Sequence, residues 1–418
     1  MSKLSKRLSK LSPEQQKLLL QRMRKKGLKL PTSKPVSPPT LGGGLPGLPT
    51  VTLSEERRAK GMGFSMLFFS GDGTSERDDK YDFLLECARF ADEHGFKGIW
   101  TPERHFQAFG GLFPNPSVLS AALAMVTKQL QIRAGSVVIP LHKPIRIAEE
   151  WAVVDNLSKG RVAISLATGW NRGDFTIMPE NFHERREIAF RNLELIRRLW
   201  RGESISFAGV DGDDFEVTIL PRPLQPELPV WVTVSNNPQT WIDAGKIGAN
   251  ILTGMGRNPD DLIPAITSYR KARIEHGHEP DAGIVSVMMH TFIGEDEALV
   301  KQKVRGPLSG YLKTFIAQEE ILSEEETGVE AKRISERDRE EMINFAFQRY
   351  FNQAALFGSQ EKCARMVEWM ASVGVDEVAC LVDFGVDHES VRESLQHLSQ
   401  LVTRYEGNKA SEKMSSDF

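Results

Sequence analysis

The chain has 418 residues, of which 40% are hydrophobic and 26% charged, and its formal net charge at pH 7 is −3. This balance is that of an ordinary water-soluble protein, and the small net charge argues against bulk affinity for nucleic acid. No apolar run approaches the roughly twenty residues that a membrane span requires, and the basic N-terminus is not followed by the apolar core of a secretory signal. The length suits two or three average domains or one β/α barrel with insertions.

The three cysteines, Cys87, Cys363 and Cys380, are odd in number and lack the spacing of metal ligands. Two of them, Cys87 and Cys363, lie in predicted helices. We therefore expect reduced thiols in a cytoplasmic protein, and no metal site.

Residues 1–30 form a segment of their own. The run SPEQ at 12–15 has the pattern of a helix N-cap, a proline in the first turn and a capping-box partner, and QQKLLLQRMRKK continues it with apolar and basic residues. A short amphipathic basic helix is therefore predicted in residues 1–30. Two roles have equal weight: docking on a partner, an acidic membrane or RNA, or a solvated helix that packs loosely or frays.

Residues 31–60 begin with PTSKPVSPPTLGGGLPGLPT, and this density of proline and glycine predicts a linker. Gly42, Gly44 and Gly47 match the spacing of a dinucleotide-binding fingerprint. That fingerprint requires a strand before the glycines and a helix after them, whereas here no strand pattern precedes them and Pro46 interrupts the run. We reject the match.

Residues 61–405 alternate between strand patterns and helix patterns. The strand patterns are short and rich in β-branched or other apolar residues, which suits strands buried on both faces of a parallel sheet. They lie at 63–71, 97–101, 131–139, 161–167, 229–235, 249–253, 283–294 and 376–385. Eight such units predict a (β/α)8 TIM barrel with two insertions, a polar hairpin at about 203–228 and a charged, solvated helical segment at about 295–357. Residues 406–418 are predicted to be a disordered tail.

Polar and titratable residues gather where these strands end, and in a β/α barrel that end carries the chemistry. They are, in chain order, Glu103, Arg104, His105, Thr168, Gly169, Asn171, Ser235, Asn236 and Asn237. The last three precede Pro238, which suits the first turn of a helix. Backbone N–H groups at such a helix start either bind a phosphate or are capped by the polar side chains alone.

Several motifs occur together in this part of the chain. Residues 100–110 read W-x-x-E-x-H-F-x-x-F-G, and the runs NP, PIRIAE and LSKGR follow before residue 162. In combination they closely resemble the bacterial-luciferase-like, flavin-dependent monooxygenases, and within them the group found beside nonribosomal peptide and polyketide synthases. The resemblance extends, more weakly, from about residue 64 to about residue 401.

The resemblance implies a site for flavin mononucleotide (FMN). In similar proteins the loop after the fifth strand holds the phosphate, and here Ser235 and Asn236 match it best, with Arg186 aligned to an arginine that reaches the same phosphate. The flavin ring is expected on the third strand, where family members often have a non-prolyl cis peptide bond, and we expect one within residues 134–136. The residues implied to bind the cofactor are Ala134, Gly135, Ser136, Thr168, Gly169, Asn171, Arg186, Ser235 and Asn236.

For catalysis, the resemblance points to Glu103, Arg104 and His105. The family pattern here is often Glu-His-His, and its middle histidine is a catalytic base in aldehyde-oxidising luciferases. Arg104 departs from that pattern, which favours a different substrate, either anionic or thioester-bound. His105 either shuttles protons or is a buried structural histidine that Glu103 holds, and the sequence leaves both roles open.

The resemblance thus predicts a monooxygenase that receives reduced FMN from a separate reductase. It would activate O2 at the flavin C4a position and oxygenate an organic biosynthetic intermediate, free or tethered to a carrier protein. A homodimer is expected from the family. Residues 12–27 resemble segments that join modules of peptide synthetases, so docking on a synthetase is a further expectation. Two alternatives stay open: a deazaflavin-dependent reductase or dehydrogenase on the same barrel, and a flavin-binding scaffold without catalysis.

Overall fold

The structure, a computed structural model, describes residues 51–407 except 73, 75–77, 236, 257–258 and 328–335, and it does not describe the side chains of 315–327. The predicted N-terminal helix, most of the predicted linker and residues 408–418 of the predicted tail lie outside the described residues.

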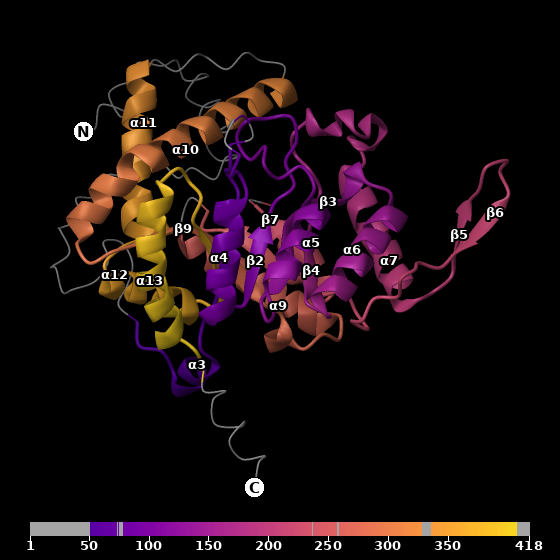
Figure 1. The fold of residues 1–418 in the computed structure, drawn as a ribbon, viewed down its shortest axis with the longest axis horizontal. Helices are drawn as coiled ribbons and strands as arrows, with labels where there is room; N and C mark the ends of the chain where they lie inside the picture. The colour runs from indigo at the N-terminus through magenta and orange to yellow at the C-terminus, as the bar shows by residue number, and fades with distance from the viewer. Residues whose placement is uncertain are drawn as a thin grey trace, which may run out of the picture. The chain divides into compact units, whose positions relative to one another are not determined.

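Parallel strands close into a barrel surrounded by helices (Figure 1). The barrel strands are β1 (Gly63–Leu67), β2 (Gly98–Thr101), β3 (Gln131–Val138), β4 (Val162–Ala167), β7 (Val230–Val234), β8 (Asn250–Gly254), β9 (Val285–Ile293) and β11 (Glu377–Leu381). Each pairs with the next in this order, and β11 closes the barrel by pairing with both β9 and β1. The predicted TIM barrel is confirmed, and each of its strands lies within a predicted strand pattern or beside its edge.

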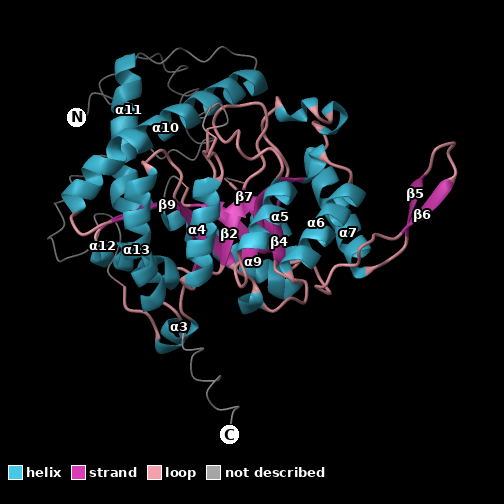
Figure 2. Ribbon diagram, in the orientation of Figure 1, coloured by secondary structure: helices cyan, strands magenta, loops and turns pink. Residues whose placement is uncertain are grey.

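Helices cover the outside of this barrel (Figure 2). They include α4 (Asp82–Glu93), α5 (Pro116–Val126), α6 (Pro144–Ser158), α7 (Arg185–Arg201), α8 (Pro238–Lys246), α9 (Leu262–Glu275), α12 (Gln360–Ser372) and α13 (His388–Arg404). Three of these helices start with a proline in the first turn, where its missing N–H costs no hydrogen bond. The side chains of Asn115 and Asn237 cap α5 and α8 by accepting from backbone N–H groups of the first turn.

A charged pair lies in the closed lower part of the barrel lumen. The Nη1 atom of Arg133 donates to Glu377 Oε1 at 2.6 Å, and both side chains are almost fully buried. The guanidinium of Arg133 lies 4.8 Å from the ring centres of both Trp100 and Trp231. The floor of the barrel is therefore packed and charged, which leaves the upper end, where the strands terminate, for a ligand.

The predicted hairpin insertion is present. Strands β5 (Ile205–Ala208) and β6 (Asp214–Val217) pair antiparallel after α7, and Figure 1 shows them projecting away from the barrel. The second insertion is helical, with α10 (Glu297–Thr327) and α11 (Glu336–Arg349) followed by a π-helical turn at Tyr350–Ala354. Strand β10 (Ala355–Gly358) then pairs with the upper half of β9.

The second insertion is anchored to the barrel at both ends. Buried side chains described in α10 and α11 are Val300, Val304, Leu308, Tyr311, Leu312, Ile343 and Phe347. The centre of the charged run, residues 328–335, lies outside the described part of the chain, and the solvated insertion predicted there stays a prediction.

The predicted linker is corrected at its end, because α3 (Glu55–Lys60) lies within 31–60. The side chain of Ser54 caps this helix by accepting from Arg57 N, and Glu55 and Glu56 occupy the first turn, where the helix dipole favours negative charge. The Arg57 guanidinium donates to the carbonyl groups of Gly61, Ala371 and Val375. The helix is thereby attached to the segments before β1 and β11 and to the last turn of α12.

Within the described residues, every helix is either too short or too polar to cross a membrane.

Candidate active site

The third strand carries an irregular backbone where the flavin ring was predicted. The peptide bond between Gly135 and Ser136 is cis, as expected within residues 134–136. The pairing of β3 with β4 shifts register between Ala134 and Val137. A Cβ atom added to Gly135 would lie 2.9 Å from the ring of Trp100, so only glycine fits against this tryptophan.

The barrel lumen is open at the height of this irregular backbone. Thr233 lies two residues beyond Trp231 on β7, so both side chains face the lumen, yet Trp231 is buried and Thr233 is exposed. The Oγ1 atom of Thr233 lies 2.5 Å from Ser136 Oγ and 2.7 Å from Ser165 Oγ. A row of hydroxyl groups therefore borders an accessible mouth beside Gly135.

The loop after β4 packs tightly against the same side of the mouth. Gly169 has φ of 76°, and an added Cβ would lie 2.7 Å from the ring of Phe175, so this position requires glycine. Asn171 bonds within its own loop, donating to Asp174 Oδ1 at 2.7 Å and accepting from Gly173 N. Thr168 is half-buried at the end of the strand. The structure places these residues together, and their contact with a cofactor stays a prediction.

The groups predicted to hold a phosphate meet at the end of β7. Ser235 is exposed directly after the strand, and α8 begins beside it at Pro238, with Asn237 Oδ1 accepting from Gln239 N in its first turn. Arg186, from the first turn of α7, donates to Thr240 Oγ1 at 2.9 Å and to Asp243 Oδ2 at 2.5 Å, so its guanidinium lies beside the first turn of α8. A hydroxyl, a helix N-terminus and a cation are the donors a phosphate needs, so these residues fit the group. Asn236 lies outside the described residues.

Glu103 lies at the end of β2 and holds two histidines with one oxygen atom. Its Oε1 atom accepts from His105 Nε2 at 3.0 Å and from His142 Nε2 at 2.5 Å, while Oε2 accepts from Val138 N at 2.7 Å. Burial alone would raise the pKa of Glu103, but the hydrogen bonds from His105 and His142 outweigh it and the pKa lies below its ordinary value. Burial lowers the pKa of His142, yet the hydrogen bond and charge of Glu103 outweigh it and raise the pKa.

His142 is a residue that the sequence prediction missed. It follows β3 in the run PLHKP, so it occupies the carboxyl end of a barrel strand just as Glu103 and His105 do. Applying the strand-end rule to this strand as well would have found it. The predicted contact between Glu103 and His105 is present, which leaves both proposed roles of His105 available.

Arg104 is buried and lies between two aromatic rings. Its guanidinium carbon is 4.7 Å from the ring centre of Phe69 and 5.0 Å from that of Phe109, and its Nε donates to the Phe109 carbonyl. Burial lowers the pKa of Arg104 and raises the pKa of Asp174. Within the described part of the chain, no three His, Cys, Asp or Glu side chains gather in a way that could hold a metal ion.

A closed β/α barrel whose polar residues gather at the carboxyl ends of its strands belongs to the TIM-barrel enzymes. The model of the luciferase-like monooxygenase family matches residues 62–377, and the chain belongs to that family.

Two relatives illustrate the similarity in sequence. The oxygenase component of the flavin-dependent trigonelline monooxygenase of Acinetobacter baylyi is 25% identical over 331 residues, which cover 76% of this chain and 88% of the relative. The FMNH2-dependent dimethylsulfone monooxygenase of Pseudomonas fluorescens is 32% identical over 152 residues, which cover 35% of this chain and 42% of the relative.

Solved structures share the fold. The monooxygenase RslO1 from Streptomyces bottropensis superposes with a TM-score of 0.67 at 22% identity, covering 82% of this chain and 99% of that one. An F420-dependent secondary alcohol dehydrogenase superposes with a TM-score of 0.62 at 15% identity, covering 83% of this chain and 99% of that one. Oxygenases and deazaflavin-dependent dehydrogenases thus occur on the same fold.

Proposed function

We propose that this chain is the oxygenase component of a two-component monooxygenase that binds reduced FMN at the barrel mouth and uses O2 to oxygenate an organic substrate. One observation supports the proposal: a hydroxyl (Ser235), a cation (Arg186) and the start of α8 lie together at the end of β7, the strand whose Thr233 is exposed. An anchored phosphate would place the attached ring over Gly135. Family membership supports the same conclusion.

The chain's own residues would bind the cofactor, position the substrate and manage protons. When bound, reduced flavin supplies the electrons for O2 activation. Glu103 orients His105 at the inner side of the loop after β2. The His142 side chain on the same carboxylate is 31% exposed against 9% for His105, so His142 is the member that exchanges protons with solvent.

The partners in this proposal are a separate flavin reductase and an organic biosynthetic intermediate, free or carried on a carrier protein. Homodimer formation belongs to the same proposal. Docking on a synthetase through residues 12–27 is also proposed, on a segment outside the described residues.

Flavin binding tests the cofactor site. Under anaerobic conditions the protein should bind reduced FMN more tightly than reduced riboflavin, because only FMN carries the phosphate. Arg186→Ala should weaken FMN binding about tenfold through loss of a charge-assisted hydrogen bond, and should leave riboflavin binding unchanged. Arg191→Ala, an exposed arginine of the same helix, serves as the control. Equal affinity for FMN and riboflavin in the wild type would refute the phosphate site.

Oxygen consumption separates the proposed oxygenase from a deazaflavin-dependent dehydrogenase, which the structural similarity also permits. The protein with reduced FMN and a turned-over substrate should consume O2 in an oxygen electrode, and an atom from labelled O2 should enter the product. Hydride transfer from reduced deazaflavin without O2 uptake would support the dehydrogenase instead.

A further inference from the structure

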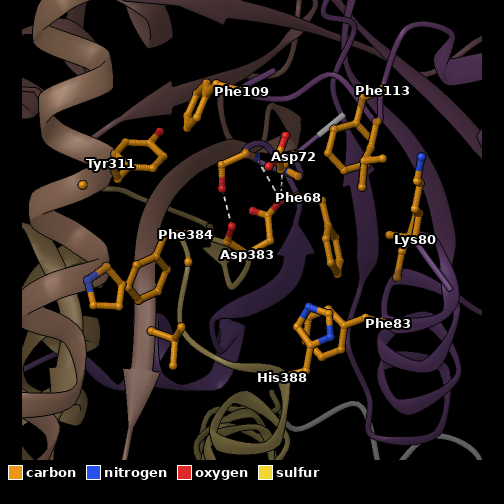
Figure 3. A pocket seen from close by; sticks show the side chains of 18 of the residues that line it. Phe68, Asp72, Lys80, Phe83, Phe109, Phe113, Tyr311, Asp383, Phe384 and His388 are labelled. Carbon is orange, nitrogen blue, oxygen red and sulfur yellow. Dashed lines mark hydrogen bonds between the residues drawn. The ribbon is translucent and has the colours of Figure 1, made fainter. Parts of the chain in front are cut away.

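A cavity of about 450 Å³ lies above β1 and β11. These strands lie across the barrel from β4 and β7, where the flavin site is proposed. Its walls come from the loops after β1, β2 and β11, from the start of α4 and from α10, as Figure 3 shows. Because α10 belongs to the second insertion, the insertion builds part of this cavity.

Several aromatic rings line the cavity. They include those of Phe68, Phe83, Phe109, Phe113, Tyr311 and Phe384. Figure 3 shows these rings around one central space, with the Asp383 carboxyl group among them. The negative faces of such rings attract a cation, and sets of rings of this kind recognise quaternary ammonium groups.

Asp383 contributes a negative charge that no cation of the described residues neutralises by an ion pair. Its carboxylate accepts from the backbone N–H groups of Phe69, Ser70 and Gly71 at 3.0, 2.9 and 3.1 Å. These neutral donors orient the carboxylate but leave its charge in place. Burial raises the pKa of Asp383 to about 6, so the group is still mostly ionised at neutral pH. A buried charge without a counter-ion is costly, and a cationic ligand would remove that cost.

We propose that this cavity binds an organic cation, a protonated or quaternary amine on an apolar frame, and that this cation is the nitrogen-bearing part of the substrate. The identification of this ligand as the substrate rests on the proposed function. The binding of a cation in the cavity does not depend on it. The cavity adjoins the catalytic loop, because Phe109 lines it and also contacts the guanidinium of Arg104. A ligand in the cavity therefore touches the loop that positions Glu103 and His105.

Other charged groups at the cavity are few and exposed. Asp72 and Asp79 add negative charge at the rim, and Lys80 adds one positive charge. The other titratable groups of the lining are Tyr81 before α4, Tyr311 of α10 and His388 at the start of α13. His388 stacks on Phe83 with ring centres 3.9 Å apart.

Calorimetric titration with benzyltrimethylammonium, and with its uncharged isostere neopentylbenzene, tests the proposal without flavin. The wild type should bind the cation at least tenfold more tightly than the isostere. Asp383→Asn should abolish that preference, whereas Asp72→Asn, which removes the same charge from the exposed rim, should change it less than twofold. Equal binding of cation and isostere by the wild type would overturn the proposal.

The pH dependence of wild-type binding gives a second test that needs no variant at Asp383. The probe cation does not titrate, so its affinity should fall roughly tenfold between pH 7 and pH 5 as Asp383 becomes protonated. His388→Gln should keep this dependence, and its loss in that variant would assign the effect to His388 and refute the proposal. Cation binding without flavin-dependent O2 uptake would refute the proposed function alone.

Discussion

At the scale of single residues, Glu103 is the group that holds the loop after β2 to the loop after β3, through His105 and His142. The folded-state pKa of His142 is raised, so its contribution to stability is fully present below its ordinary value of 6.5 and is lost as pH rises through the folded-state pKa. The pKa of Glu103 is lowered, so its contribution is present above 4.5 and is lost as pH falls through the folded-state pKa. Both contributions to stability are therefore present between about pH 4.5 and pH 6.5.

Replacing His142 by glutamine tests this pairing. His142→Gln should lower the free energy of unfolding by about 1–2 kcal/mol near pH 5.5, because a hydrogen bond to a charged group is lost. The difference from wild type should be smaller at about pH 8.5 than near pH 5.5, because the contribution of His142 is lost as pH rises through its folded-state pKa. Denaturant unfolding at both pH values measures it, with the exposed His183→Gln as control. A difference that grows with pH would contradict the assigned pair.

Sequence reasoning reached Glu103 and His105 because they are close in the chain and follow one strand. It missed the third member because His142 is 39 positions from Glu103 and meets it only through the pairing of β2 with β3. It also identified Arg104 as a departure from the family pattern. The pattern could not tell that this guanidinium packs between Phe69 and Phe109, since Phe69 belongs to another strand end.

At the scale of elements, the helices and strands that the sequence predicted correctly were those marked by local sequence patterns. Short apolar runs identified the barrel strands, and the prolines at the starts of α5, α6 and α8 marked where those helices begin. The helix α3 was missed because six residues carry little periodicity and follow a proline-rich run. The cavity beneath α10 was equally out of reach, because it depends on how an insertion packs against strands distant in sequence.

Arg57 makes α3 part of the barrel, and its removal should be costly. Arg57→Ala leaves the carbonyl groups of Gly61, Ala371 and Val375 without this donor. We expect the free energy of unfolding to fall by about 2–3 kcal/mol, since hydrogen bonds from a charged donor are lost at partly buried acceptors. Arg58→Ala, the exposed neighbour, should change it by less than about 0.5 kcal/mol. Chemical denaturation measures both, and equal losses would show that Arg57 acts only as a surface charge.

At the scale of the whole molecule, the lumen joins strands from all sides of the barrel. Glu377 of β11 accepts from Arg133 of β3, from Ser65 of β1 at 2.8 Å and from Ser286 of β9 at 3.1 Å. The indole N–H groups of Trp100 and Trp231 donate to these same two serine hydroxyls. The sequence predicts a strand around each of these residues. That their side chains meet inside the barrel follows from its closure and from the register of its strands, which the sequence pattern does not give.

A double-mutant cycle on this pair tests whether the lumen acts as one unit. Glu377→Leu leaves the Arg133 guanidinium buried without its counter-charge, and should lower the free energy of unfolding by about 3–5 kcal/mol. Arg133→Met should have an effect of similar size, because it leaves the Glu377 carboxylate buried alone. The double variant replaces both charges by apolar side chains, so its loss should be well below the sum of the two single losses. Denaturant unfolding of all four proteins measures the coupling. Additive losses would mean that solvent, rather than the opposite side chain, stabilises each charge. That result would contradict the closed lower part of the lumen, where Arg133 and Glu377 are both buried.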